Sequence, residues 1–132
     1  MSDLKQIREN MKSIKVLYAE DEIEVQKQTL QFFQKIFQNV DTASNGMEGL
    51  ELFEKNGYDL VITDLKMPKM DGREMLAKIH EINKDTVLMV MTASDSNIDA
   101  SKTVCDAYLY KPISFVEFVE AFEPLQDRLL KK

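Results

Sequence analysis

Five polar residues directly follow short apolar runs, and they could act together if the fold brings them to one place. Glu20 and Asp21 follow the run IKVLYA, and Asp64 follows LVIT. Thr92 follows VLMVM, and Lys111 follows AYLY. The set therefore contains three carboxylates, one hydroxyl and one ammonium group.

Three carboxylates in one place repel one another, so at least one would have a raised pKa unless a cation lay among them. Mg²⁺ suits such a site because it accepts oxygen ligands and keeps several waters. Zinc is disfavoured because neither His nor Cys stands in these motifs. With a metal bound, the ammonium and hydroxyl groups could receive an anion, as phosphoryl transfer requires. Asp64 is the candidate nucleophile because carboxylates form aspartyl phosphates.

The elements that must position these residues can be read from the apolar pattern. Short runs with little alternation predict five strands buried on both faces, over residues 14–19, 40–43, 60–63, 87–91 and 107–110. Apolar residues at helical spacing predict helices between and after the strands. These helices cover residues 22–38, 46–56, 72–82, 95–103 and 114–130.

Two of the helices are irregular in sequence. Pro124 should kink or end the helix over 114–130, because proline lacks a backbone N–H group. The helix over 95–103 offers only Ile98 and Ala100 to a core. We therefore expect it to be the least firmly held of the five.

Repeated alternation of strand and helix predicts an α/β fold, with a doubly wound five-stranded parallel sheet and helices on both faces. All strands of such a sheet point the same way, so residues that follow the strands gather at one edge, where ligands bind. The sequence therefore predicts that the five polar residues share one pocket.

Residues 1–12 precede the first strand and carry Leu4, Ile7 and Met11 at helical spacing. The favoured interpretation is a frayed leader, because chain ends are poorly ordered unless they are tied down. The alternative is a short docked helix. Residues 13–130 are expected to form one domain, since a chain of 132 residues fits a single core.

Composition and net charge restrict the cellular compartment and the classes of partner that we expect for this chain. Apolar runs fall far short of the roughly 20 residues needed to cross a bilayer, so no membrane association is expected. The single cysteine, Cys105, excludes an internal disulfide and indicates a reducing cytoplasm. A net charge of −6 argues against direct nucleic-acid binding, which needs a basic surface.

The motifs resemble the receiver domain of two-component response regulators, over nearly the whole chain. They are Glu20-Asp21, Asp64, Met67-Pro68, Asp71-Gly72, Thr92-Ala93, Tyr108 and Lys111-Pro112. The resemblance implies that Asp64 is the phosphoacceptor, which takes its phosphoryl group from a phosphohistidine. It also implies that Mg²⁺ is held by Glu20, Asp21, Asp64 and the backbone carbonyl of Lys66. Lys111 would hold a phosphoryl oxygen.

The same resemblance implies a flavodoxin-like strand order, 2-1-3-4-5, and a switching mechanism. Thr92 would move to bond the phosphoryl group, and Tyr108 would turn inward after it. The surface of residues 95–103, the last strand and the last helix would carry the signal. The implied partners are a sensor histidine kinase or phosphotransfer protein, and a downstream effector protein or a lost output domain. The domain would be a monomer or a phosphorylation-dependent dimer, and a phosphoacceptor rather than an enzyme.

Other functions with related chemistry remain open. One is a receiver-like adaptor that binds its partner without phosphorylation. Another is a Mg²⁺-dependent phosphohydrolase, but such enzymes usually carry Asp-x-Asp after the first strand, whereas Asp64-Leu65-Lys66 follows the third. A flavin protein of this architecture would need a Ser/Thr/Gly-rich phosphate loop, and the acidic AEDEIE would repel phosphate.

Lys66 and Ser94 lie two residues past Asp64 and Thr92, at positions that vary among receiver domains. We hypothesise that they set the lifetime of the phosphorylated state, because they would border the path of the hydrolytic water. Exchanging the two residues should change the rate of phosphate loss, measured by following the phosphoprotein over time. Unchanged lifetimes would rule the hypothesis out.

Overall fold

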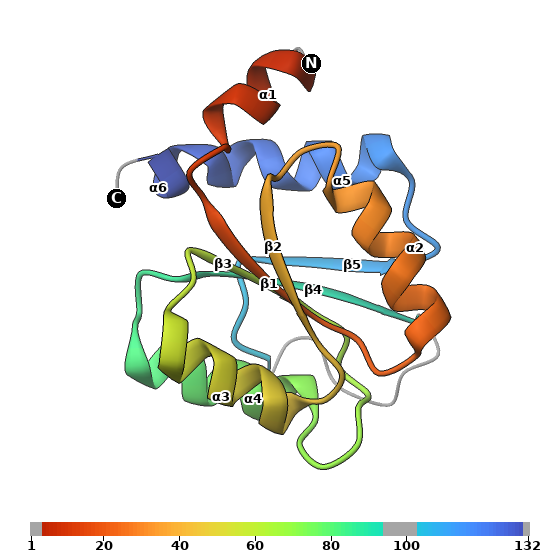
Figure 1. The fold of residues 1–132 in the computed structure, drawn as a ribbon, viewed down its shortest axis with the longest axis vertical. Helices are drawn as coiled ribbons and strands as arrows, with labels where there is room; N and C mark the ends of the chain where they lie inside the picture. Colours follow the sequence, from red (N-terminus) through yellow and green to blue (C-terminus); the bar gives the residue numbers. More distant parts are fainter. Residues whose placement is uncertain (1–3, 94–102, 131–132) are drawn as a thin grey trace.

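The computed structural model describes residues 4–93 and 103–130, which include a five-stranded parallel sheet. The strand order is β2-β1-β3-β4-β5, so the predicted fold class and strand order are confirmed (Figure 1). The strands are β1 Lys15–Ala19, β2 Asn39–Ala43, β3 Leu60–Thr63, β4 Val87–Ala93 and β5 Ala107–Lys111. β4 and β5 run further than predicted, so Thr92 and Lys111 lie within strands rather than after them.

Helices cover both faces of the sheet. They are α1 Leu4–Asn10, α2 Ile23–Phe33, α3 Gly46–Asn56, α4 Gly72–Ile82, α5 Phe115–Phe122, the 3₁₀ helix η2 Glu123–Leu125 and α6 Gln126–Leu130. α2 and α5 lie on one face, and α3 and α4 lie on the other (Figure 1). Within the described residues, no helix is long and apolar enough to span a membrane.

Phenylalanine rings join α2 to α5 across one face of the sheet. Phe33 lies 5.3 Å from Phe118 between ring centroids, and Phe37 lies 5.3 Å from Phe122. All four side chains are fully buried. Such ring pairs contribute about 0.5–1.5 kcal/mol each beyond the area they bury. The cluster therefore holds the end of α2 and the turn after it against α5.

Residues 4–10 form a docked helix, so the favoured interpretation of a frayed leader is wrong. Ile7 on α1 and Met11 just after it are fully buried in the core beneath α2 and α5. The Arg8 guanidinium donates a hydrogen bond to the carbonyl of Gln34 beyond the end of α2. Burial of two large apolar side chains offsets the entropy that would otherwise fray this end.

The ends of two predicted helices can be compared with the structure. One helix ends earlier than predicted, and the other ends where proline was expected to interrupt it. The helix predicted over 22–38 ends at Phe33, and a tight turn follows in which the Ile36 N–H bonds the Phe33 carbonyl at 2.9 Å. This turn places Ile36 and Phe37 in the core outside the helical register. The expected effect of Pro124 is confirmed, because α5 gives way to η2 there. The helix predicted over 95–103 lies, except for its last residue, outside the described residues.

The turn after β3 depends on the absence of a side chain at Gly72. Asp71 caps α4 by accepting a hydrogen bond from the Glu74 N–H at 2.8 Å. A Cβ on Gly72 would lie 2.0 Å from the backbone oxygen of Asp64. Without a side chain at this position, α4 can begin close to the backbone that carries Asp64.

Replacing Ile7 with Ala should lower the free energy of unfolding by about 2–5 kcal/mol, because the side chain is buried in the core. Leu4→Ala on the same helix is the matched control. Because Leu4 is 39% exposed, this substitution should lower the free energy of unfolding far less. Urea denaturation measures both. Equal, small losses would mean that α1 does not dock in solution.

Gly72→Ala should destabilise the fold by about 1–3 kcal/mol or more, because backbone atoms cannot yield to the new Cβ. Gly49→Ala in α3 is the control. Its Cβ would meet the Met75 Sδ at 2.6 Å, a side chain that can move, while helix propensity improves by about 1 kcal/mol. Urea denaturation should therefore rank Gly72→Ala well below Gly49→Ala in stability, and the reverse order would refute this account of the turn.

Candidate functional site

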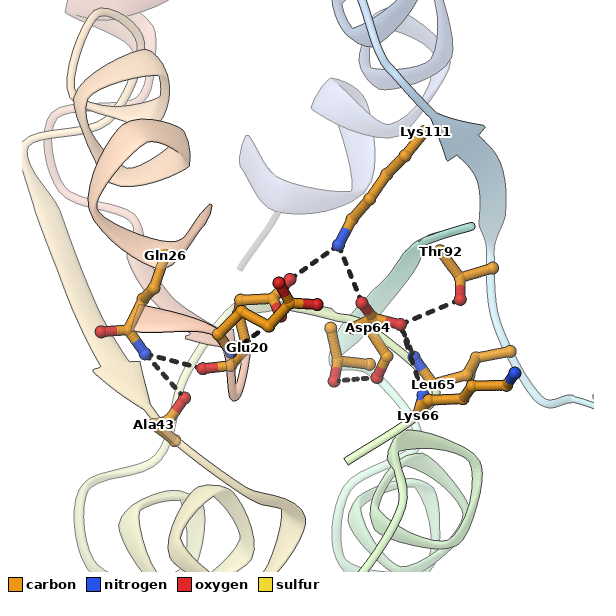
Figure 2. Close-up of polar contacts among 10 residues, drawn as sticks. Glu20, Gln26, Ala43, Asp64, Leu65, Lys66, Thr92 and Lys111 are labelled. Atoms are coloured by element: carbon orange, nitrogen blue, oxygen red, sulfur yellow. Dashed lines mark hydrogen bonds and ion pairs between the residues drawn. The ribbon is translucent and has the colours of Figure 1, made fainter. Parts of the chain in front are cut away.

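The structure brings four of the five polar residues into direct contact at the carboxyl-terminal edge of the sheet. Glu20 follows β1, Asp64 follows β3, Thr92 lies near the end of β4 and Lys111 ends β5 (Figure 2). They come from four different strands and are joined by hydrogen bonds and ion pairs. Parallel strand direction alone thus accounts for their meeting.

Asp64 lies at the centre of this group, and its side chain is 13% exposed. Its Oδ1 accepts hydrogen bonds from the Thr92 hydroxyl at 2.9 Å and from the Leu65 N–H at 2.6 Å. A longer bond of 3.3 Å comes from the Lys66 N–H. Its Oδ2 accepts from the Lys111 ammonium at 2.8 Å. The carboxylate is therefore fixed in orientation by backbone and hydroxyl donors, with one oxygen directed to a cation.

Lys111 bridges the two acids. Its ammonium group lies 2.7 Å from Glu20 Oε1 and 2.8 Å from Asp64 Oδ2. Burial opposes the charge on Lys111, but the hydrogen bonds to Asp64 and Glu20 outweigh it and raise the pKa of Lys111 above its ordinary 10.5. Lys111 is consequently charged at every physiological pH.

Glu20 is buried despite its charge, with a side chain only 1% exposed. This burial raises the pKa of Glu20, while the bonds from Lys111 and from the Glu22 N–H at 3.2 Å act to lower it. A buried carboxylate without such partners would be costly. Glu20 therefore depends on Lys111 to remain ionised in this position.

Gln26 was not identified from the sequence, although it holds the backbone of the site. Its buried side-chain amide donates to the carbonyls of Glu20 at 2.9 Å and Ala43 at 3.1 Å, which ties the ends of β1 and β2 together (Figure 2). The available signal was its place on α2, one turn past Glu22, where the helix faces the sheet edge. A polar residue buried there needs partners among backbone groups.

Asp21 does not join the contacts of the other four residues and is exposed. In residues 4–93 and 103–130, no three His, Cys, Asp or Glu side chains are grouped to hold a metal. Nevertheless, the donors present suit Mg²⁺, because two acids share a single positive charge between their oxygens.

Tyr108 lies on β5, half-buried against the core beneath α3 and α4. Its ring meets that of Tyr110 in a T-shaped contact with 5.2 Å between centroids, and Tyr110 is 50% exposed. Thr92, in contrast, is fully buried, and its hydroxyl already bonds Asp64. The switching roles expected of Thr92 and Tyr108 stay predictions.

Curated relatives of this chain include a response regulator and a transcriptional regulatory protein. It is 33% identical over 128 residues to the probable C4-dicarboxylate response regulator DctR of Priestia megaterium, covering 92% of this chain and 56% of that protein. It is 30% identical over 117 residues to the transcriptional regulatory protein PcoR of Escherichia coli, covering 86% of this chain and 52% of that protein. The chain thus spans about half the length of these relatives.

Solved structures and a family model agree with these relatives. A receiver domain from Clostridium thermocellum has a TM-score of 0.73 and 33% identity, covering 87% of this chain and 95% of that one. The response regulator TrrA of Thermotoga maritima, solved in complex with Mg²⁺ and BeF, has a TM-score of 0.71 and 34% identity, covering 85% of this chain and 98% of that one. The model of the response regulator receiver domain matches residues 16–123. The chain therefore belongs to the response regulator receiver domain family of two-component signalling proteins.

Proposed function

We propose that this domain is a phosphorylation-activated switch whose phosphoacceptor is Asp64. The observation that supports this most directly is the fixed Asp64 carboxylate, bonded by the Thr92 hydroxyl and the Lys111 ammonium. One group would be the nucleophile, and the other two would bind oxygens of the arriving phosphoryl group. Membership of the receiver family supports the same assignment.

The transfer itself needs little covalent chemistry from the protein. A carboxylate oxygen of Asp64 attacks the phosphorus of a partner's phosphohistidine, so a P–O bond forms as the N–P bond breaks. The imidazole leaves with the electron pair and takes up a proton. Lys111 is placed to bind a phosphoryl oxygen as a point charge.

Mg²⁺ would neutralise charge on the phosphoryl group during this step. Glu20, Asp21 and Asp64 would hold it together with the backbone carbonyl of Lys66. Support comes from the two acids that already share one positive charge. Further support comes from the relative TrrA, whose structure contains Mg²⁺.

Phosphorylation would then shift the equilibrium between two conformations of the signalling surface. It adds about −1.5 to −2 charges and new acceptor oxygens beside Thr92. The Thr92 hydroxyl would turn from Asp64 to the phosphoryl group, and Tyr108 would move inward. A preference of about 3 kcal/mol for the active state would change the population ratio roughly 150-fold. The surface of residues 95–103, β5 and α5 would pass this change to a partner.

The partners would be a sensor histidine kinase or phosphotransfer protein upstream and an effector protein or output domain downstream. The aligned regions cover only 56% of DctR and 52% of PcoR, which leaves room for an output region in those proteins. The setting would be the cytoplasm. Nucleic-acid contact by this domain is not expected, given its net charge of −6.

Asp64→Asn should abolish phosphorylation, because the amide cannot form the acyl phosphate. Intact-mass spectrometry after incubation with Mg²⁺ and a small phosphodonor measures the added phosphoryl group. Asp71→Asn is the matched control, since Asn also caps helices and this residue lies outside the contacts of Asp64. Modification of Asp64→Asn at the wild-type level would refute the assignment. An unmodified wild-type protein would favour the phosphorylation-independent adaptor.

A further inference from the structure

Gln26 lies at the end of the first turn of α2, close to Glu20, and it is buried. Its side-chain nitrogen donates hydrogen bonds to the carbonyls of Glu20 at 2.9 Å and of Ala43 at 3.1 Å. Two carbonyl oxygens can be satisfied together only by a group that carries two N–H donors, which a glutamine amide does and a carboxylate does not. The contact therefore depends on the chemistry of glutamine as well as on its length.

Hydrogen bonds close the segment from residue 20 to residue 26 into a ring. The Gln26 N–H donates to the Glu22 carbonyl at 2.8 Å, and the Glu22 N–H donates to Glu20 Oε2 at 3.2 Å. The Gln26 side chain then returns to the Glu20 carbonyl. One short segment thus fixes Glu20 at its backbone and at its carboxylate. Asp21 belongs to the same segment, so the ring also restricts the backbone from which this exposed acid extends.

The second bond of Gln26 joins this segment to β2. The Ala43 carbonyl accepts the Glu20 N–H at 3.0 Å as well as the Gln26 amide at 3.1 Å. β2 is an edge strand that pairs with β1, and these two bonds close the pairing at its carboxyl-terminal end. Removal of the Gln26 amide would take away one of the two bonds and weaken the hold on the Glu20 carbonyl.

We propose that Gln26 is a positioning residue for Mg²⁺ binding by Glu20 and Asp21. Its amide bonds the backbone and not a carboxylate, so it acts through the placement of the two acids rather than as a ligand. Removing groups that orient metal ligands typically lowers metal affinity by about 10–100-fold. This inference rests on the proposed function, in which these acids help to hold Mg²⁺.

Isothermal titration calorimetry with MgCl₂ alone tests this role, at a temperature at which circular dichroism shows each protein to be folded. Gln26→Met keeps the length and neutrality of the side chain but removes both donors, so it should bind Mg²⁺ about tenfold more weakly than the wild type, or worse. Gln31→Met makes the same change at an exposed position on α2 and should leave the affinity within about twofold. Equal affinities of Gln26→Met and the wild type would overturn the proposal.

Hydrogen exchange followed by NMR in metal-free protein measures the placement of Glu20 itself. The Glu20 N–H bonds the Ala43 carbonyl, and the Asp64 N–H bonds the Ala19 carbonyl at 3.1 Å, between the ends of β1 and β3. Gln26→Met should speed exchange of the Glu20 N–H about tenfold or more and leave that of the Asp64 N–H within about twofold. No change at Glu20, or equal acceleration at both amides, would overturn the proposal.

The wild-type protein supplies a test that does not depend on the folding of Gln26→Met. The side-chain amide hydrogens of Gln26 should exchange far more slowly than those of the exposed Gln31, and equal rates would contradict the proposal. A wild-type protein that binds no Mg²⁺ would contradict it as well. None of these experiments contains a phosphodonor, so failure of Asp64 to take up phosphate would count against the proposed function alone.

Discussion

The carboxylates of Glu20 and Asp64 are largely buried at the carboxyl-terminal edge of the sheet, and the positive charge of Lys111 offsets the cost of burying them. Removing a carboxylate from water costs several kcal/mol unless a partner compensates it. Glu20 and Asp64 share one such partner, at 2.7 and 2.8 Å. Shared compensation leaves the pair with net negative charge, which the Mg²⁺ of the proposed function would neutralise.

The rest of the fold holds these charged groups in place from both faces. Phenylalanine rings pack α2 and the turn after it against α5 on one face of the sheet. On the other face, α4 begins against the backbone of Asp64, where only glycine fits at position 72. A rigid support of this kind would let a small change at the proposed phosphoacceptor, Asp64, be transmitted rather than absorbed.

Sequence patterns predicted the parallel sheet and the meeting of four residues at its carboxyl-terminal edge: Glu20, Asp64, Thr92 and Lys111. This was possible because all strands of a parallel sheet end at the same edge, whatever their side chains. The patterns did not reveal the Gln26 bonds, in which a buried polar residue of α2 finds backbone carbonyl partners. They also did not reveal the Glu20–Lys111 pair, which depends on side-chain reach between residues distant in sequence. The docked helix α1 was also missed. Its three apolar residues are too few to decide between docking and fraying without knowledge of the surface beneath them.

The most direct test of the account is the position of a metal ion in a crystal of this protein grown with Mn²⁺, which anomalous scattering locates without ambiguity. If Asp64 is the phosphoacceptor of a metal-assisted switch, a manganese ion should lie in contact with both Glu20 and Asp64. A crystal in which manganese is bound elsewhere or not at all would contradict this.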